Sequence, residues 1–202
     1  MKRCVLLFFV ILLAATVCAQ QPTQPAPSGV PPAGQTPPSG PPPAAPAAQM
    51  PAAKPQDVDS IDHILAAVYD AISGPAGQAR DWERFRSLFI PEARLIPNSV
   101  RLDGSIVHTV LSVDDYVTRA SRGLAQQGFF ESETARSAQV YGQIAQVFST
   151  YESKREKAGP AFAHGINSFQ LLNDGKRWYV VTIMWQGETA QAPIPPEYQK
   201  KP

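Results

Sequence analysis

The chain has 202 residues, a formal net charge of +1 at pH 7, and only two cysteines, Cys4 and Cys18. A charge balance this even argues against nucleic acid or an anionic membrane as a partner. Both cysteines lie among the first 20 residues, so the rest of the chain has no disulfide, no thiol nucleophile and no thiolate metal site. The histidines show no metal-ligand spacing, so we expect neither a metal nor another cofactor.

Residues 1–19 have the pattern of a secretory signal peptide. Lys2 and Arg3 precede an apolar stretch, and cleavage is expected after Ala19. The stretch is shorter than the ~20 apolar residues that a membrane-spanning helix needs, so no integral membrane segment is expected after cleavage. A lipoprotein anchored through Cys18 is the less favoured alternative, because Val17 stands where a small residue should precede that cysteine. The protein is therefore predicted to be exported, either periplasmic or secreted.

Residues 20–56 hold 13 of the 21 prolines, among Ala, Gln, Gly and Ser. A segment of this composition cannot bury a core, and we expect a disordered Pro/Ala-rich linker with polyproline II character. The folded unit is expected over 57–190, a length that suits one domain. A Pro-rich C-terminal tail follows over 191–202.

Three helices are expected in the first half of this domain, over 57–73, 81–93 and 112–128. The first has apolar residues at helical spacing. The second begins at Asp81, a good N-cap, and carries a bulky apolar face that includes Trp82, Phe85 and Phe89. The third begins after Ser112, which is expected to cap it.

The residue pattern of the second half of the domain predicts β-strands. A loosely alternating run over 129–140 precedes a long strand candidate over 141–156 and a hairpin over 164–186. The hairpin turn contains Asp174-Gly175, a pair typical of such turns. Helices followed by a block of antiparallel strands predict an α+β domain with helices on one face of a curved sheet.

These segments together resemble the nuclear transport factor 2-like superfamily, specifically its SnoaL-like branch. The resemblance covers 58–188 and rests on the segments DWERFRSLFIPEARLI, GQIAQVFSTYES and GINSFQLLNDGKRWYVVTIMWQ. It extends to uncharacterised exported bacterial proteins with this domain. It implies a cone-shaped, strongly curved and mostly antiparallel sheet around N-terminal helices, with a pocket inside. Domains of this kind commonly pair through the outer face of the sheet.

The resemblance also implies which residues face the pocket. On the last strand, Trp178 and every second residue after it are expected to face the pocket. The alternate residues Tyr179, Val181, Ile183 and Trp185 are predicted to form a homodimer interface on the outer face. The predicted pocket is mostly apolar with a few polar groups, and it comprises Trp82, Phe85, Phe89, Arg94, Tyr116, Tyr151, Asn167, Trp178, Thr182 and Met184.

Enzymes of the superfamily build their chemistry from pocket carboxylates, histidines and tyrosines, but no carboxylate is expected at an inward position on the last three strands. His108, oriented by Asp115 and assisted by Tyr116, is the weak candidate for a general base. Three hypotheses follow. The first is a non-catalytic domain that binds a small apolar ligand or serves as a dimeric interaction module. The others are an isomerase, dehydratase or cyclase using a pocket His and Tyr, and a structural envelope protein with a vestigial pocket.

Overall fold

The computed structural model describes residues 50–101 and 103–199. The predicted signal peptide and most of the predicted linker lie outside the described residues. In the described part of the chain, no helix is both long enough and apolar enough to cross a membrane. The elements in chain order are α1 (Pro55–Val58), α2 (Ile61–Ile72), α3 (Trp82–Ser87), β1 (Phe89–Val100), β2 (Ile106–His108), α4 (Val113–Gln126), β3 (Phe130–Tyr141), β4 (Ile144–Lys154), β5 (Ala161–Asn173), β6 (Trp178–Gly187) and the 3-10 helix η1 (Pro196–Tyr198).

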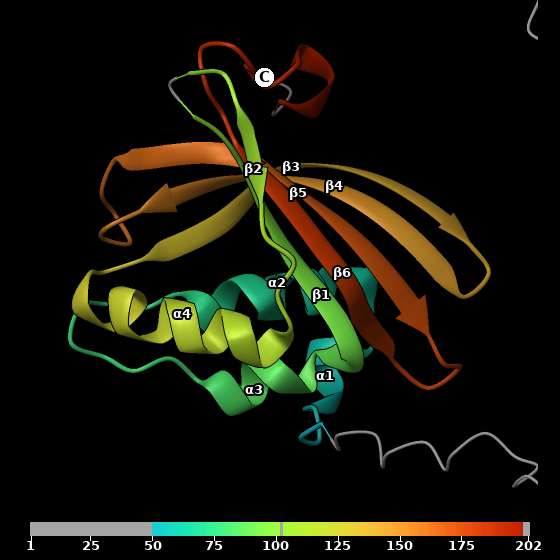
Figure 1. Cartoon of the computed structure of the whole chain (residues 1–202). Coiled ribbons are helices and arrows are strands. Elements are labelled where there is room, and N and C mark those ends of the chain that lie inside the picture. The colour runs from blue at the N-terminus through green and yellow to red at the C-terminus, as the bar shows by residue number, and fades with distance from the viewer. Residues whose placement is uncertain (1–49, 102, 200–202) are drawn as a thin grey trace, which may run out of the picture. The chain divides into compact units, whose positions relative to one another are not determined.

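The six strands form one sheet in the order β2-β1-β6-β5-β4-β3. Neighbouring strands are antiparallel except β1 and β6, which run parallel. The sheet is strongly curved, and α2, α3 and α4 pack against one of its faces (Figure 1). The predicted α+β architecture, a mostly antiparallel curved sheet around N-terminal helices, is confirmed.

The first predicted helix forms as two pieces. Ser60 has an extended backbone (φ −143°), and its side chain accepts a hydrogen bond from the His63 amide, so it caps α2. The apolar positions of α2 are buried against the sheet, as their helical spacing predicted. An ion pair joins α1 to α3, because Arg84 Nε of α3 donates to Asp57 Oδ2 of α1 at 2.7 Å. This guanidinium lowers the pKa of the Asp57 carboxyl.

The second predicted helix is shorter than expected. Asp81 caps α3 by accepting from the Arg84 amide, as predicted, but α3 ends at Ser87 rather than near Pro91. Phe89 then begins β1 and lies opposite Val180 of β6. Pairing with a strand some 90 residues away therefore overrides the helical preference of this short apolar run.

β6 carries a β-bulge at Val181. Val180 lies opposite Leu171 of β5. The next paired residue, Thr182, lies opposite Gln170, which leaves Val181 without a partner. One extra residue in a strand reverses the face taken by every side chain that follows it.

The bulge corrects the assignment of faces on β6. Val180 is fully buried in the core, but so is Ile183, which an unbroken alternation would place on the other face. Trp185 packs against the core as well. Thr182 and Met184 were predicted to line the pocket; they take the outer face instead, and Met184 is 44% exposed.

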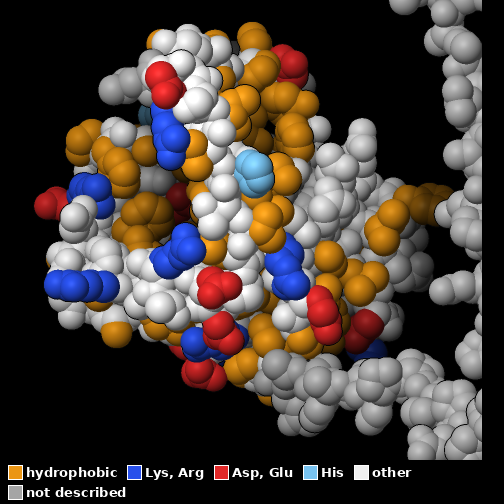
Figure 2. Space-filling model, viewed as in Figure 1, with side chains coloured by type: hydrophobic (Ala, Val, Ile, Leu, Met, Phe, Trp, Pro, Cys, Tyr) orange, Lys and Arg blue, Asp and Glu red, His pale blue; other side chains and the backbone are white. Residues whose placement is uncertain are grey.

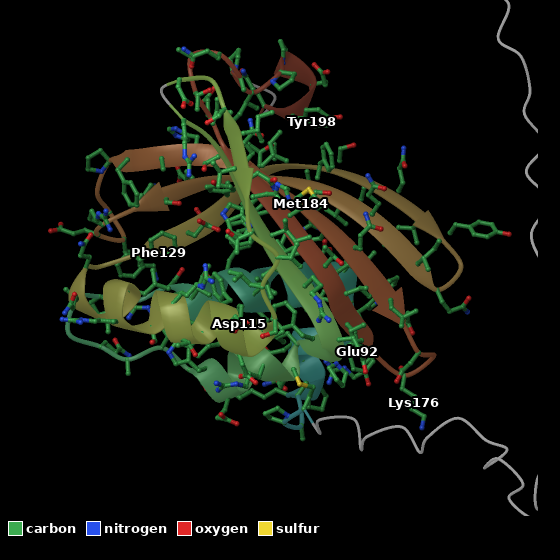
Figure 3. All side chains as sticks on the ribbon, in the orientation of Figure 1. Glu92, Asp115, Phe129, Lys176, Met184 and Tyr198 are labelled. Carbon is green, nitrogen blue, oxygen red and sulfur yellow. The ribbon has the colours of Figure 1, made fainter. Side chains whose placement is uncertain are left out.

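The C-terminal segment covers part of the outer face of the sheet. Thr150 Oγ1 of β4 donates to the Tyr198 carbonyl at 2.6 Å, and the Tyr198 ring lies 5.4 Å from the Phe148 ring. Figure 3 places Met184 and Tyr198 on the side of the sheet away from the helices. The predicted dimer face is therefore wrong in two of its four members, Ile183 and Trp185, which face the core. Tyr179 and Val181 remain partly exposed.

Candidate functional site

A cavity of about 120 Å³ lies between the inner face of the sheet and the helices α2 and α4. In the space-filling view, a hollow with hydrophobic walls opens between α4 and the strand ends beside it (Figure 2). Figure 3 places Phe129, one of the lining residues, next to the end of α4. The aliphatic part of the lining comprises Val68, Ile72, Leu95 and Ile183.

Aromatic side chains make up half of the cavity lining. Tyr116 of α4 stacks on Phe85 with ring centroids 5.4 Å apart, and Trp185 meets Tyr116 edge-on at 6.0 Å. These rings form a rigid wall because each is held by its neighbours. The complete aromatic set is Phe85, Tyr116, Phe129, Tyr151, Phe169 and Trp185.

Glu131 of β3 supplies the one charged side chain that lines the cavity. Its amide donates to Ser73 Oγ at 3.0 Å, which ties this part of β3 to the end of α2. The carboxylate accepts from Ser153 Oγ at 2.8 Å and from Asn167 Nδ2 at 3.4 Å. Desolvation in these apolar surroundings raises the pKa of the Glu131 carboxyl to about 7, although both hydrogen bonds oppose the shift. Glu131 therefore changes charge near neutral pH.

A hydrogen-bonded network holds Asn167 in place. Asn167 Nδ2 also donates to Tyr69 Oη at 3.1 Å, and Tyr69 Oη shares a 2.6 Å hydrogen bond with Ser149 Oγ. Ser149 Oγ in turn donates to Glu133, which is paired with Arg136. Burial raises the pKa of the Tyr69 hydroxyl well above its usual range, so it stays protonated. The network fixes the Asn167 amide beside Glu131, and it does so through the neutral groups of Tyr69 and Ser149.

Two tyrosine hydroxyls of the lining are left for a ligand. Among the described residues, neither Tyr116 Oη nor Tyr151 Oη has a hydrogen-bond partner, and both side chains line the cavity. Desolvation raises the pKa of Tyr151 to about 12 and that of Tyr116 above its usual range. Both hydroxyls therefore remain neutral and can donate a hydrogen bond to a bound molecule.

Gly165 of β5 makes room for the Tyr151 ring. A Cβ atom at this position would collide with Tyr151 Oη and with the Gln186 carbonyl of β6. The absence of a side chain at Gly165 therefore sets where the Tyr151 hydroxyl lies.

We expect Gly165→Ala to lower the free energy of unfolding by about 2 kcal/mol, because the strand and the ring must both shift. Chemical denaturation monitored by fluorescence measures this loss. Gly175→Ala is not a fair control, since Gly175 has a positive φ of 90°. Gly123→Ala on α4 is, because a Cβ there meets nothing within 4 Å. Equal stability of the Gly165→Ala and Gly123→Ala variants would contradict this account of Tyr151.

The structure brings together part of the predicted pocket. Phe85, Tyr116, Tyr151 and Asn167 all line the cavity. The remaining six do not, and they fall into two groups. Three pack in or beside the core outside the cavity lining: Trp82, Phe89 and Trp178. Three lie outside: Arg94, Thr182 and Met184.

Arg94 is exposed on β1 and does not line the cavity. Its guanidinium donates to the carbonyl oxygens of Glu92 at 2.5 Å and Ala93 at 2.9 Å. The neighbouring Ala93 and Leu95 are the buried residues of this stretch. The prediction that Arg94 binds a carboxylate in the pocket is therefore wrong.

The predicted His108 and Asp115 pair does not form. His108 is exposed on β2, at the edge of the sheet. Asp115 completes a capping box with Ser112, since Asp115 Oδ2 accepts from the Ser112 amide at 3.1 Å and the Asp115 amide donates back to Ser112 Oγ. Of the three predicted catalytic candidates, only Tyr116 faces the cavity.

Glu131 was missed in the sequence because β3 alternates poorly. Its inward positions carry Glu131 and Glu133, so they read as surface residues, and a bulge between Glu133 and Ala135 then shifts the alternation. The expectation of no inward carboxylate concerned the last three strands, and Glu131 lies on β3, a strand for which no inward residues were predicted. A weak signal existed in Ser149, Ser153 and Asn167, three inward polar residues that need hydrogen-bond partners.

Within residues 50–101 and 103–199, no group of three or more His, Cys, Asp and Glu side chains is placed to hold a metal ion. The polar groups of the cavity suit an organic molecule instead, with one carboxyl, one amide and two hydroxyls.

No protein-family model matches the sequence, and no curated protein matches it either. Solved structures do match the fold. A protein of unknown function with a cystatin-like fold from Nostoc punctiforme is 11% identical, with a TM-score of 0.50 over 64% of this chain and 90% of that one. The β subunit of a proposed aromatic-ring-hydroxylating dioxygenase from Novosphingobium aromaticivorans is 14% identical, with a TM-score of 0.50 over 67% and 95%.

A nuclear transport factor 2-like protein of unknown function from Shewanella baltica is 14% identical and covers 64% of this chain and 92% of its own, with a TM-score of 0.44. These identities are too low to transfer an activity, but the architecture is shared. The mostly antiparallel, curved sheet with helices on its inner face (Figure 1) agrees with the architecture that the resemblance implied. The domain therefore shares the cystatin-like fold of the Nostoc punctiforme protein.

Proposed function

We propose that this domain binds a small, mostly apolar molecule in the cavity. The observation that carries the proposal is the lining itself, in which ten apolar or aromatic side chains surround Glu131 and Asn167. Pockets that bind small molecules have this composition, apolar walls with a few polar groups that orient the ligand. Apolar cavities of about 150 Å³ bind benzene. The ligand proposed here is therefore of about that size.

Acid–base catalysis is a second candidate, and the pKa of about 7 at Glu131 favours it. A carboxyl that titrates near the working pH is suited to take up and return a proton. Ionised Glu131 would take a proton from a carbon next to a carbonyl group, while Tyr116 or Tyr151 donates a hydrogen bond to the carbonyl oxygen. The chemistry would belong to the isomerase, dehydratase or cyclase kind, with Glu131 in the role that the sequence suggested for His108.

Three sequence-based expectations remain proposals. We propose export on the basis of the signal-peptide pattern in residues 1–19, and N-terminal sequencing of the protein from its host should begin at Gln20. Membership of the SnoaL-like branch rests on the resemblance of the segments. We also propose that two copies pair through outer-face residues that the C-terminal segment leaves uncovered. Analytical ultracentrifugation would then give a mass near twice that of the monomer.

Filling the cavity is expected to abolish ligand binding. Val68→Phe adds bulk to the cavity wall from α2. Binding to the folded state stabilises it by about 2.7 kcal/mol at a ligand concentration 100 times the Kd. A panel of small cyclic and branched hydrophobic molecules should therefore raise the Tm of the wild-type domain but not that of Val68→Phe.

Val110→Phe is the matched control, because Val110 is 57% exposed and lies outside the cavity lining. This variant should keep the full Tm shift. Identical shifts in Val68→Phe and Val110→Phe would place binding elsewhere on the surface. If no molecule of the panel shifts the wild-type Tm, the binding function is wrong.

A further inference from the structure

Glu131 has no counter-ion among the residues that the structure describes. In the described part of the chain it belongs to no ion pair, whereas other acidic side chains, such as Asp57 and Glu133, are paired with arginines. Its two hydrogen-bond donors, Ser153 and Asn167, are neutral. The described residues that line the cavity include no Lys, Arg or His. Buried charges in proteins are normally paired, so an ionised Glu131 calls for a positive partner from outside the chain.

The walls around Glu131 are suited to a cation of low hydration. Aromatic faces attract ammonium groups, most strongly where water is excluded, and cages of aromatic rings bind quaternary ammonium ligands. Six aromatic side chains line this cavity. Phe85 and Tyr116 are stacked, and Trp185 stands perpendicular to Tyr116, so three of these rings form one packed aromatic wall.

We propose that the ligand of this cavity is a small organic cation, an alkylammonium or quaternary ammonium group, held between the Glu131 carboxylate and the aromatic wall. The proposal rests on the proposed binding function and names its ligand class. The aliphatic side chains Val68, Ile72, Leu95 and Ile183 contact the alkyl groups of such a ligand. The free hydroxyls of Tyr116 and Tyr151 can donate to a hydroxyl or carbonyl oxygen that it carries.

A proton and the cation compete for Glu131. The titratable and polar groups that line the same hollows as Glu131 are Tyr69 and Asp70 from α2, Tyr116 from α4, Glu133 and Arg136 from its own strand, Tyr151 and Ser153 from β4, and Asn167 from β5. The tyrosines have raised pKa values and stay neutral, and Glu133 is paired with Arg136. The affinity for a cation should therefore fall as the pH is lowered through about 7, where Glu131 becomes protonated.

The test compares choline with 3,3-dimethyl-1-butanol, which has the same shape but no charge. Calorimetric titration at about pH 8 should show choline binding at least about tenfold more tightly than the alcohol. Glu131→Gln keeps the shape of the side chain and should remove this preference. Glu92→Gln is the matched control, because Glu92 is exposed on β1 (Figure 3), and it should keep the preference.

Equal or stronger binding of the alcohol would overturn the cation proposal while leaving the proposed binding function intact. A preference for choline that survives in Glu131→Gln would also overturn it, because the carboxylate would then have no part in recognition. Failure of both probes, together with Tm shifts from neutral members of the hydrophobic panel, would again count against a cation only. Failure of every molecule would remove the binding function and this inference together.

Discussion

Glu131→Gln is expected to stabilise the folded domain at pH 8 by about 3 kcal/mol relative to the wild type. The pKa of Glu131 is about 7 in the folded domain and 4.5 in its ordinary state. Between these two values the folded state binds more protons than the unfolded state, so wild-type stability falls as the pH rises from about 4.5 to 7. Above pH 7 the cost of a partly buried carboxylate without an ion-pair partner is present in full. Glutamine is never charged and avoids that cost.

Urea denaturation of both proteins between about pH 4.5 and 8 checks this prediction. The two unfolding free energies should be similar at the acid end and diverge as the pH rises. Glu92→Gln, at an exposed position, should follow the wild type throughout. A constant difference between wild type and Glu131→Gln across the whole range would contradict the raised pKa. The experiment also bears on the ligand, because a saturating cation should reduce the difference at pH 8 by supplying the missing partner.

Arg80→Ala is expected to lower the free energy of unfolding by about 4 kcal/mol. The Arg80 side chain is 6% exposed and donates to five carbonyl oxygens, those of Ile72, Gly74, Pro75, Gln78 and Leu124. Ile72 is the last residue of α2, and Leu124 lies in the last turn of α4. Helix C-termini leave carbonyl groups without intrahelical partners and carry partial negative charge, so one guanidinium satisfies both ends.

The loss in Arg80→Ala should appear as a lower denaturation midpoint with an unchanged m-value. Arg80→Lys keeps the charge but cannot reach five acceptors in a planar fork, so an intermediate loss is expected. Arg122→Ala is the control, since Arg122 is exposed on α4. If Arg80→Ala and Arg122→Ala had the same free energy of unfolding, the prediction would be wrong, because water would then satisfy the five carbonyl groups as well as the guanidinium does. Burial of Arg80 lowers its pKa, which shows the desolvation that the five hydrogen bonds offset.

Local patterns in the sequence were reliable wherever the decisive interactions lie within one element. Ser112 and Asp115 form the predicted start of α4 as a capping box, because both groups belong to the same helical turn. The hairpin turn forms at Asp174, whose side chain accepts from the Lys176 and Arg177 amides, and Gly175 takes a positive φ in this turn. Tyr151 of β4 and Asn167 of β5, both predicted to line the pocket, are buried and line the cavity.

The errors arise where two distant strands determine the geometry. Nothing near Val181 marks it as a bulge, because the bulge exists only in the pairing of β6 with β5. Its consequence was that Ile183 and Trp185 exchanged faces with Thr182 and Met184 in the prediction. Phe89 was placed on a helix for a similar reason, since its partner Val180 lies far along the chain.

The sequence by itself determined the class of fold, the helix caps, the hairpin and four of the cavity residues, because periodicity, capping and turn conformation are properties of neighbouring residues. Only the tertiary structure decided that Glu131 is the charged group of the cavity. Glutamate is hydrophilic in any local pattern, and its desolvation follows from side chains on α2, α4, β4 and β5 that close around it. A partly buried charge with no ion-pair partner among the described residues is a property of that assembly, and it is the feature from which the ligand class is inferred.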